Sequence, residues 1–345
     1  MPAGHPGQAF PNVSAAHQPG GQRDMVHVLD LADAAGAMTL AAECAREFGT
    51  VQDGRFAAEA RAIAHDLPRA AREVMARGWR AADIETIRIR GHLIDEAVLE
   101  PTPMDWIMAG TPNGRVYEFL LVLYGALLGE IFGWSTQQQG RLVLDVVPMP
   151  GYENELISFC SERELSWHTE DAFSPYRGDY VGLMCLRSPD NIPTTIATVD
   201  FGEVPADIAE VLGQPRFITA PDISHVAGTE GPCDAVAIFE EHESGMRLRI
   251  DRDFTQAREG DKDAARALEW ITHELDHNLR DMRLEAGDVC FLDNHRVVHG
   301  RRPFTPRYNG RDRWLKRISV VRDGRRIRRA LADPQLPVVG APGTA

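Results

Sequence analysis

The sequence predicts an α+β protein with a β-sandwich or jelly-roll core and flanking helices. The first third of the chain carries Ala, Glu, Arg and Leu at helical spacing, and the rest consists of many short apolar segments separated by Pro, Gly and Asn turns. Neither an internal repeat nor a linker marks a second domain. We therefore expect one domain at residues 26–330, between a disordered tail at 1–25 and a flexible tail at 331–345.

Four segments have helical patterns. Residues 39–48 and 56–77 predict two helices, although Pro68 interrupts the second. Residues 117–128 are strongly apolar and predict a buried helix, whereas 263–282 predict an amphipathic one.

Short strands are expected between and after these helices. They are predicted at residues 86–91, 142–148, 180–186, 194–199, 217–218, 288–292 and 316–321. Residues 221–245 are Gly-rich, acidic and hard to assign, which is typical of a mobile cover over an active site.

The composition limits the possible partners and compartment. The net charge of −14 argues against nucleic acid and anionic membranes as partners and favours a small cationic substrate. The five cysteines form no CxxC pair, which indicates a reducing compartment. No apolar run approaches the roughly 18 residues of a membrane span, and the N-terminus lacks a signal-peptide core. We expect a cytoplasmic protein; its oligomeric state is not predicted.

The segment at residues 167–173 carries the first chemical signal. His168 and Glu170 stand two positions apart, so on a strand both side chains leave the same face. An imidazole and a carboxylate on one face provide two ligands of a 2-His-1-carboxylate iron(II) site.

Residues 287–317 provide a second histidine and a cation. An iron-binding jelly roll needs its distal histidine on a later strand, because ligands from facing strands meet across the barrel. His299 is favoured over His295 because Gly300 and then Arg313 follow it. Arg313 follows 14 positions later, and its planar guanidinium suits bidentate capture of a carboxylate such as that of 2-oxoglutarate. Each residue alone is more often structural; their order and spacing together indicate an iron site.

Three segments resemble a known family. They are FGWSTQQ from Phe132, WHTEDAFSPYRGDYVGLMCLRSPD from Trp167, and DNHRVVHGRRPFTPRYNGRDRWLKR from Asp293. They resemble the clavaminate synthase-like iron(II)/2-oxoglutarate oxygenases, in particular the free amino acid β-hydroxylases of peptide-antibiotic pathways. The resemblance extends over about residues 91–322 and implies a double-stranded β-helix of cupin-like type, with Fe(II), 2-oxoglutarate and O₂ as cofactor and co-substrates.

The resemblance also implies roles for individual residues. It makes His168, Glu170 and His299 iron ligands, and it places Arg313, with Thr194 or Thr195, at the co-substrate. Around the amino acid it implies the following residues: Gln137 and Arg317 at the α-carboxylate, Glu170 at the α-amino group, Leu156 and Ser158 in the wall, and Asp222, Asp251 and Asp253 at a guanidinium. Without the resemblance, Asp251 and Asp253 would be interpreted as a solvated strand face.

The expected reaction is hydroxylation of a free basic L-amino acid at the β-carbon, with release of succinate and CO₂, in non-ribosomal peptide antibiotic biosynthesis. L-arginine or a cyclised arginine such as L-enduracididine is favoured. Lysine or asparagine as the substrate, and γ-hydroxylation or desaturation of arginine, stay open. The segment after Ser224 is shorter than the covering loop of the arginine enzyme and lacks its Asn-Asn pair, which leaves the side chain beneath it undetermined.

The sequence also bears on three alternatives: a zinc hydrolase, a non-catalytic binding protein and a halogenase. His273, Glu274 and His277 form a literal H-E-x-x-H, the zinc-hydrolase pattern, but Arg280 and Arg283 stand where its longer form needs Gly and His. The intact ligand set argues against a non-catalytic cupin-like binding protein. Halogenation is disfavoured as well, because halogenases replace the carboxylate ligand by a small residue.

Overall fold

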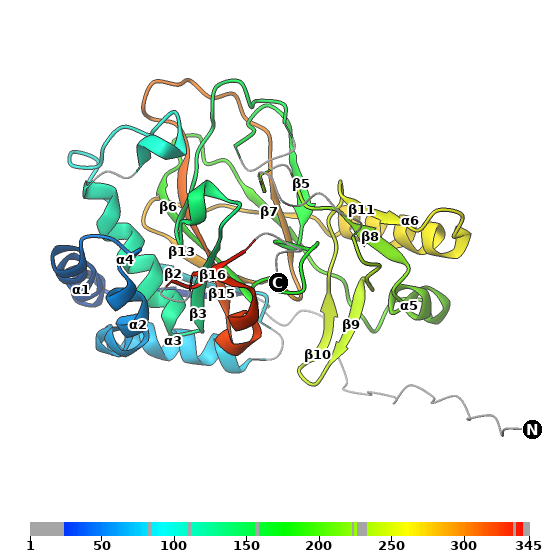
Figure 1. Ribbon diagram of the computed structural model, residues 1–345. Helices are drawn as coiled ribbons and strands as arrows, with labels where there is room; N and C mark the ends of the chain where they lie inside the picture. Colours follow the sequence, from blue (N-terminus) through cyan, green and yellow to red (C-terminus); the bar gives the residue numbers. More distant parts are fainter. Residues whose placement is uncertain are drawn as a thin grey trace, which may run out of the picture.

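The computed structural model describes residues 24–81, 84–109, 112–155, 159–222, 224–225, 233–333 and 336–340. Two β-sheets lie in the middle of the molecule, with a group of helices on one side and a smaller mixed layer on the other (Figure 1). The predicted α+β jelly-roll class is confirmed.

The larger sheet has nine strands. Its order is β1 (Asp24–Val28), β2 (Thr86–Arg90), β13 (Val289–Asp293), β6 (Tyr180–Arg187), β15 (Trp314–Val321), β3 (Glu130–Trp134), β17 (Val338–Val339) and β16 (Leu331–Asp333), with β4 (Leu144–Val146) also paired to β15. The neighbours run antiparallel except in the pairs β1–β2 and β17–β3. Strands β6 and β15 are buried along almost their whole length. β6 is accordingly a nearly continuous apolar run, whereas β15 also buries the cations Lys316 and Arg317.

The smaller sheet is antiparallel and carries the candidate site. Its order is β12 (Arg280–Met282), β7 (Thr194–Ala197), β14 (Val298–Arg301) and β5 (Leu165–His168). Alternate side chains of the two sheets pack into one apolar layer, which includes Val181, Leu183, Cys185, Ile196, Met282, Cys290, Leu292 and Leu315.

Four helices cover the other face of the larger sheet: α1 (Leu31–Phe48), α2 (Gly54–Ile63), α3 (Arg69–Arg80) and α4 (Pro112–Ala126) (Figure 1). Pro68 caps the N-terminus of α3, where a missing N–H costs nothing, so the predicted helix at 56–77 is two helices. The apolar α4 is fully buried at Phe119, Leu120 and Leu121, as its composition predicts. Five 3-10 turns complete the helical set: η1 (Ala64–Asp66), η2 (Trp106–Ala109), η3 (Gln138–Gly140), η4 (Gly324–Arg326) and η5 (Arg328–Ala330).

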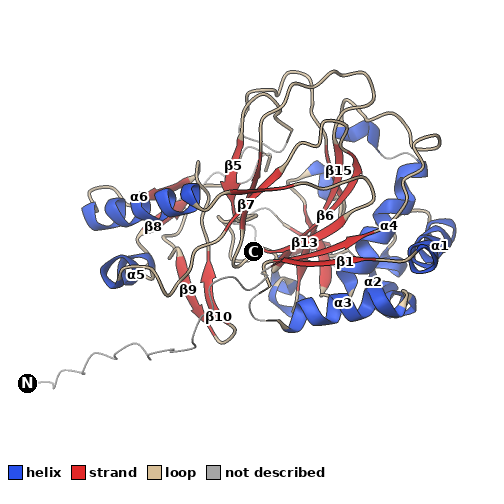
Figure 2. Cartoon of the chain, turned by 180° about the vertical axis from the view of Figure 1, so that it is seen from behind, coloured by secondary structure: helices blue, strands red, loops and turns tan. Residues whose placement is uncertain are grey.

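A second layer lies beside the smaller sheet, on the side away from α1 to α4 (Figure 2). It contains α5 (Ala206–Leu212), α6 (Lys262–His277), the pair β8 (Phe217–Thr219) and β11 (Thr255–Ala257), and the hairpin β9 (Phe239–His242) and β10 (Gly245–Leu248). Within the expected cover at 221–245, β9 and the first residue of β10 are regular structure, while residues 223 and 226–232 lie outside the described residues.

Three boundaries differ from the sequence predictions. The helix predicted at 263–282 ends at His277, because Asn278 caps it and residues 280–282 pair with β7 as β12. Asp24 and Met25, assigned to a tail, pair with β2 in β1. Within the tail expected from residue 331, β16 and β17 join the larger sheet through β3. Among the described residues, no helix is long and apolar enough to cross a membrane.

Candidate active site

Three potential metal ligands meet at the edge of the smaller sheet. His299 of β14 lies directly opposite His168 at the end of β5, so their rings are 4.6 Å apart. Glu170 follows β5, and its Oε2 lies 3.3 Å from Nε2 of His299 and 3.8 Å from Nε2 of His168. One ligand atom from each residue lies within 4.8 Å of the others, and this is the one such cluster in the described part of the chain.

Local contacts explain why these residues can meet. A Cβ at Gly300 would collide with the carbonyl oxygen of Leu165, so glycine after His299 lets β14 approach β5. Nδ1 of His168 lies 2.9 Å from the carbonyl oxygen of Ser166 and donates its proton there. That hydrogen bond turns Nε2 of His168 toward Glu170, so Nε2 is the nitrogen that can bind a metal once it has lost its proton.

The two carboxylate oxygens of Glu170 have different neighbours. Its Oε1 forms an ion pair with Nη1 of Arg317 at 2.7 Å, whereas its buried Oε2 makes no hydrogen bond among the described residues and faces the two imidazoles. Burial opposes ionisation, but the charge of Arg317 and the two histidines outweigh it and hold the pKa of Glu170 well below its usual range. An ionised oxygen without a donor, between two imidazole nitrogens, fits a divalent metal ion.

The two histidines have opposite pKa shifts. Burial lowers the pKa of His299 to about 4, so its imidazole is neutral, which is the ligating form. Burial also disfavours the charged form of His168, but the adjacent Glu170 carboxylate outweighs it and raises the pKa of His168 to about 9. Binding of a metal at this site would therefore release a proton from His168.

Asn294 holds the loop that carries Glu170. Its Oδ1 accepts from the backbone N–H of Glu170 at 2.7 Å, and its Nδ2 donates to the carbonyl oxygens of Glu170 and Gly178. No motif in the sequence marks Asn294, although it directly precedes His295, the alternative candidate for the distal ligand. His295 instead bonds Asp179 through Nε2 at 2.7 Å and lies outside the cluster.

A buried cationic site lies near the ligands. Arg313 is 6% exposed, its Nη2 donates to Thr194 Oγ1 at 3.3 Å, and its Nε makes no hydrogen bond among the described residues. No carboxylate of the described chain forms an ion pair with Arg313, and burial lowers the pKa of its guanidinium to about 10. The hydroxyl of Thr195, on the adjacent β7 position, is buried without a partner as well. A buried cation with unpaired donors is suited to a carboxylate ligand.

Further polar groups lie around Arg317, the partner of Glu170 Oε1. Gln137 is buried, and its Oε1 lies 3.5 Å from Nη2 of Arg317. The next two residues, Gln138 and Gln139, have φ values of 41° and 60°, so the turn that presents Gln137 is held in the left-handed region. Nε2 of Gln137 donates to Oγ of Ser224 at 2.9 Å.

The three candidate acids have different surroundings. Asp222 accepts from the N–H and the hydroxyl of Ser224 through Oδ1. Asp251 forms a β-bridge with His168; its Oδ1 accepts from the N–H groups of Asp253 and Phe254, and its Oδ2 has no partner among the described residues. Burial raises the pKa of Asp251 to about 6, with a contribution from nearby Asp222.

Asp253 is half-buried on the same turn. Leu156 and Ser158, expected in the pocket wall, lie outside the described residues.

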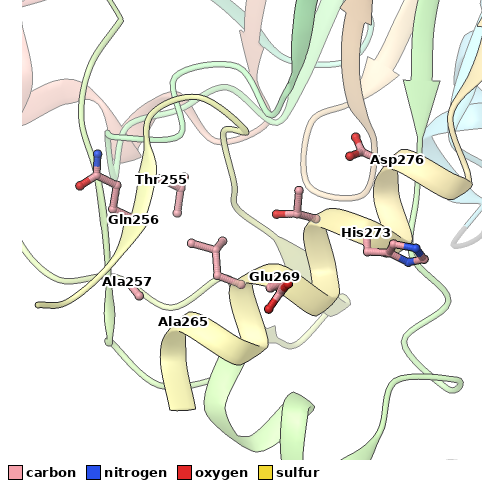
Figure 3. Close-up of a pocket in the computed structure, with 9 residues that line it drawn as sticks. Thr255, Gln256, Ala257, Ala265, Glu269, His273 and Asp276 are labelled. Atoms are coloured by element: carbon pink, nitrogen blue, oxygen red, sulfur yellow. The ribbon is translucent and has the colours of Figure 1, made fainter. Parts of the chain in front are cut away.

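The H-E-x-x-H residues lie elsewhere. His273 and His277 are exposed on α6, and Glu274 accepts from Asn278, which caps the helix. His273 lines an open groove of about 520 Å³ between α6 and β11 together with Glu269 and Asp276, but in the described part of the chain these side chains form no cluster of potential metal ligands (Figure 3). The structure therefore offers no support for a zinc hydrolase.

A 2-His-1-carboxylate cluster beside a buried, unpaired arginine on a jelly roll defines an iron(II)- and 2-oxoglutarate-dependent oxygenase. Comparison with known proteins agrees. The chain is 36% identical to enduracididine beta-hydroxylase of Streptomyces hygroscopicus over 324 residues, which cover 86% of this chain and 94% of the relative. The chain belongs to the TauD/TfdA dioxygenase family, within the group of amino acid hydroxylases; the family model "Taurine catabolism dioxygenase TauD, TfdA family" matches residues 209–319.

Two further relatives support this assignment. L-ornithine/L-arginine 3-hydroxylase of Catenulispora acidiphila is 33% identical, with 68% of this chain and 76% of the relative covered. The crystal structure of the non-heme iron oxygenase OrfP with Fe, succinate and (3S)-hydroxy-L-Arg superimposes with a TM-score of 0.86 at 37% identity, covering 91% of this chain and 99% of OrfP. Another OrfP structure contains Fe and alpha-ketoglutaric acid.

Proposed function

We propose that this oxygenase hydroxylates the β-carbon of a free basic L-amino acid, with L-arginine or a cyclised arginine such as L-enduracididine as the substrate. The observation that carries the proposal is Asp251, a half-buried carboxyl whose Oδ2 has no partner among the described residues, one β-bridge away from His168. A guanidinium placed there would supply the missing charge. The names of the relatives, hydroxylases of enduracididine and of ornithine and arginine, support the same class of substrate.

His168, Glu170 and His299 would hold the iron, and Arg313 would hold the distal carboxylate of 2-oxoglutarate, with Thr194 and Thr195 beside it. The donors that lack partners in this region fit these groups. With ferrous iron and 2-oxoglutarate bound, O₂ would be the oxidant: one oxygen atom is used in converting 2-oxoglutarate to succinate and CO₂, and the other is used in hydroxylating the C–H bond.

The remaining residues would orient the amino acid. Arg317 and Gln137 would bind its α-carboxylate, since each presents a polar group to the same space. Arg317 already holds Oε1 of Glu170, so one guanidinium would fix both the ligand carboxylate and the substrate. Glu170 would also face the α-amino group. Asp222, Asp251 and Asp253 would receive the cationic end, which sets the position of the β-carbon before the iron site.

The test neutralises the acidic pair. Asp251→Asn together with Asp253→Asn removes two charges but keeps shape, and asparagine at 251 can still accept the turn's N–H groups through its side-chain oxygen. Loss of charge-assisted hydrogen bonds should lower kcat/KM for L-arginine about a hundredfold, with more 2-oxoglutarate consumed per hydroxylated product. Neutral amino acids of similar length should lose little or gain.

The measurement is a panel of basic and neutral amino acids with succinate release and product mass as readouts. Asp263→Asn, on the exposed first turn of α6, is the matched control and should leave every rate unchanged. Unchanged kcat/KM and coupling on every basic amino acid in the double variant would show that the two aspartates are a solvated face. Turnover of neutral amino acids alone by the unaltered enzyme would refute the proposed substrate class.

A further inference from the structure

A histidine that the functions above do not use is buried beside the site. His225 is 4% exposed, and both of its ring nitrogens have partners: Nδ1 lies 2.7 Å from Oγ1 of Thr136 and Nε2 lies 3.2 Å from Oδ1 of Asp171. The ring is edge-on to Trp134 at 5.4 Å and to Phe173 at 4.7 Å between centroids. His225 thus occupies a cage with two polar and two aromatic walls.

The walls of this cage belong to the two segments that carry substrate and metal groups. Trp134 ends β3 and Thr136 directly precedes Gln137, whereas Asp171 and Phe173 follow Glu170. Asp171 has a φ of 55°, and its other carboxylate oxygen accepts from Nε1 of Trp134 at 2.7 Å. Two hydrogen-bonded rings therefore hold Asp171 in a backbone conformation that non-glycine residues rarely adopt.

The residue before His225 connects the two ends of the candidate amino acid site. The hydroxyl of Ser224 accepts from Nε2 of Gln137 at 2.9 Å and donates to Oδ1 of Asp222 at 2.5 Å. Gln137 is the group at the α-carboxylate end, and Asp222 is one of the acids at the cationic end. Any displacement of His225 would move Ser224, and with it both hydrogen bonds.

We infer that His225 is a positioning residue for the amino acid: by filling the cage, it fixes Ser224 so that Gln137 and Asp222 stand at the separation that a basic amino acid requires. This inference rests on the proposed function. A merely structural histidine would contribute to the stability of the fold. His225 packs against Trp134, which belongs to a small apolar cluster, but both of its hydrogen bonds go to residues that adjoin the site: Thr136 precedes Gln137, and Asp171 follows Glu170.

The test uses the iron(II)- and 2-oxoglutarate-loaded enzyme without oxygen and measures binding of L-arginine by calorimetry. His225→Phe keeps an aromatic ring in the cage but removes both hydrogen bonds, and Thr136→Val removes one of them with little change in volume. Each variant should weaken the binding of L-arginine, His225→Phe by about tenfold, and leave the affinity for 2-oxoglutarate unchanged. In turnover, KM for L-arginine and the uncoupled fraction should rise while KM for 2-oxoglutarate stays constant.

The controls separate the possible outcomes. His242→Asn alters a histidine at the end of β9 that bonds only Ser244, and it should bind L-arginine as the unaltered enzyme does. Ser224→Ala, which leaves the cage intact, should reproduce the loss. Unchanged L-arginine affinity in His225→Phe and Thr136→Val, or equal loss of affinity for both ligands, would overturn the inference. If the unaltered enzyme bound no basic amino acid, the proposed function would fail instead.

Discussion

Replacing Arg313 by lysine tests whether this residue binds the co-substrate or the amino acid. The arginine is buried, has one hydrogen bond to Thr194 at 3.3 Å and has no carboxylate partner among the described residues. A bound carboxylate would therefore receive two parallel N–H donors from the fork. Lysine keeps the charge but reaches with a single ammonium, so one charge-assisted hydrogen bond is lost, worth about 1.5–3 kcal/mol. That free energy corresponds to an increase of roughly tenfold to a hundredfold in KM for 2-oxoglutarate.

The assay is succinate release at varied 2-oxoglutarate with a saturating basic amino acid, and then the reverse. KM for the amino acid should change far less than KM for 2-oxoglutarate. Arg311→Lys, two positions earlier with a side chain 68% exposed, is the matched control and should leave both values unchanged. If KM for the amino acid rose instead, Arg313 would belong to that substrate, and Arg317 would be the residue to test for 2-oxoglutarate.

Two further predictions concern the histidines. His168→Ala or His299→Ala should abolish oxygen consumption with added iron and saturating 2-oxoglutarate, with folding retained; near-native rates would remove that histidine from the ligand set. Burial lowers the pKa of His92 to about 4, against 6.5 in the unfolded chain, so between these values the unfolded state binds more protons and the protein loses stability as the pH falls. Measured by urea unfolding, the loss of stability between pH 7 and pH 5 should be smaller by about 2 kcal/mol in His92→Asn than in the unaltered protein, and it should be unchanged in the exposed control His65→Asn; equal losses in all three would contradict this.

Much of this protein could be predicted from residue order alone. The periods of apolar residues indicate strands and helices because each element must bury one face, and the apolar α4 and β6 lie where those periods predict. The alternation of side chains along a strand predicts that His168 and Glu170 share a face. In the structure β5 ends at His168 and Glu170 lies in the turn after it, yet the two side chains reach the same site. Gly300, directly after His299, indicates that two backbones approach closely. In the structure a Cβ at this position would collide with the carbonyl oxygen of Leu165.

Element boundaries were predicted less well, because pairing between distant segments decides them. Residues 280–282 continue a helical pattern, yet they extend the smaller sheet since β7 offers them a free edge. Residues 338–339 follow a polar tail but pair with β3. Short strands such as β5 and β14 carry too few residues for a period to be detected.

The sequence by itself determined the class of protein: a jelly roll with an H-x-E pair, a later histidine and an arginine 14 positions beyond it, since these depend on local spacing and order. Only the tertiary structure decided which groups are left without partners. It pairs His295 with Asp179, places His225 in a cage of four side chains from two distant segments, and leaves Glu170 Oε2 without a hydrogen bond among the described residues. Hydrogen bonding and burial depend on neighbours brought together across the fold, and no sequence interval encodes them.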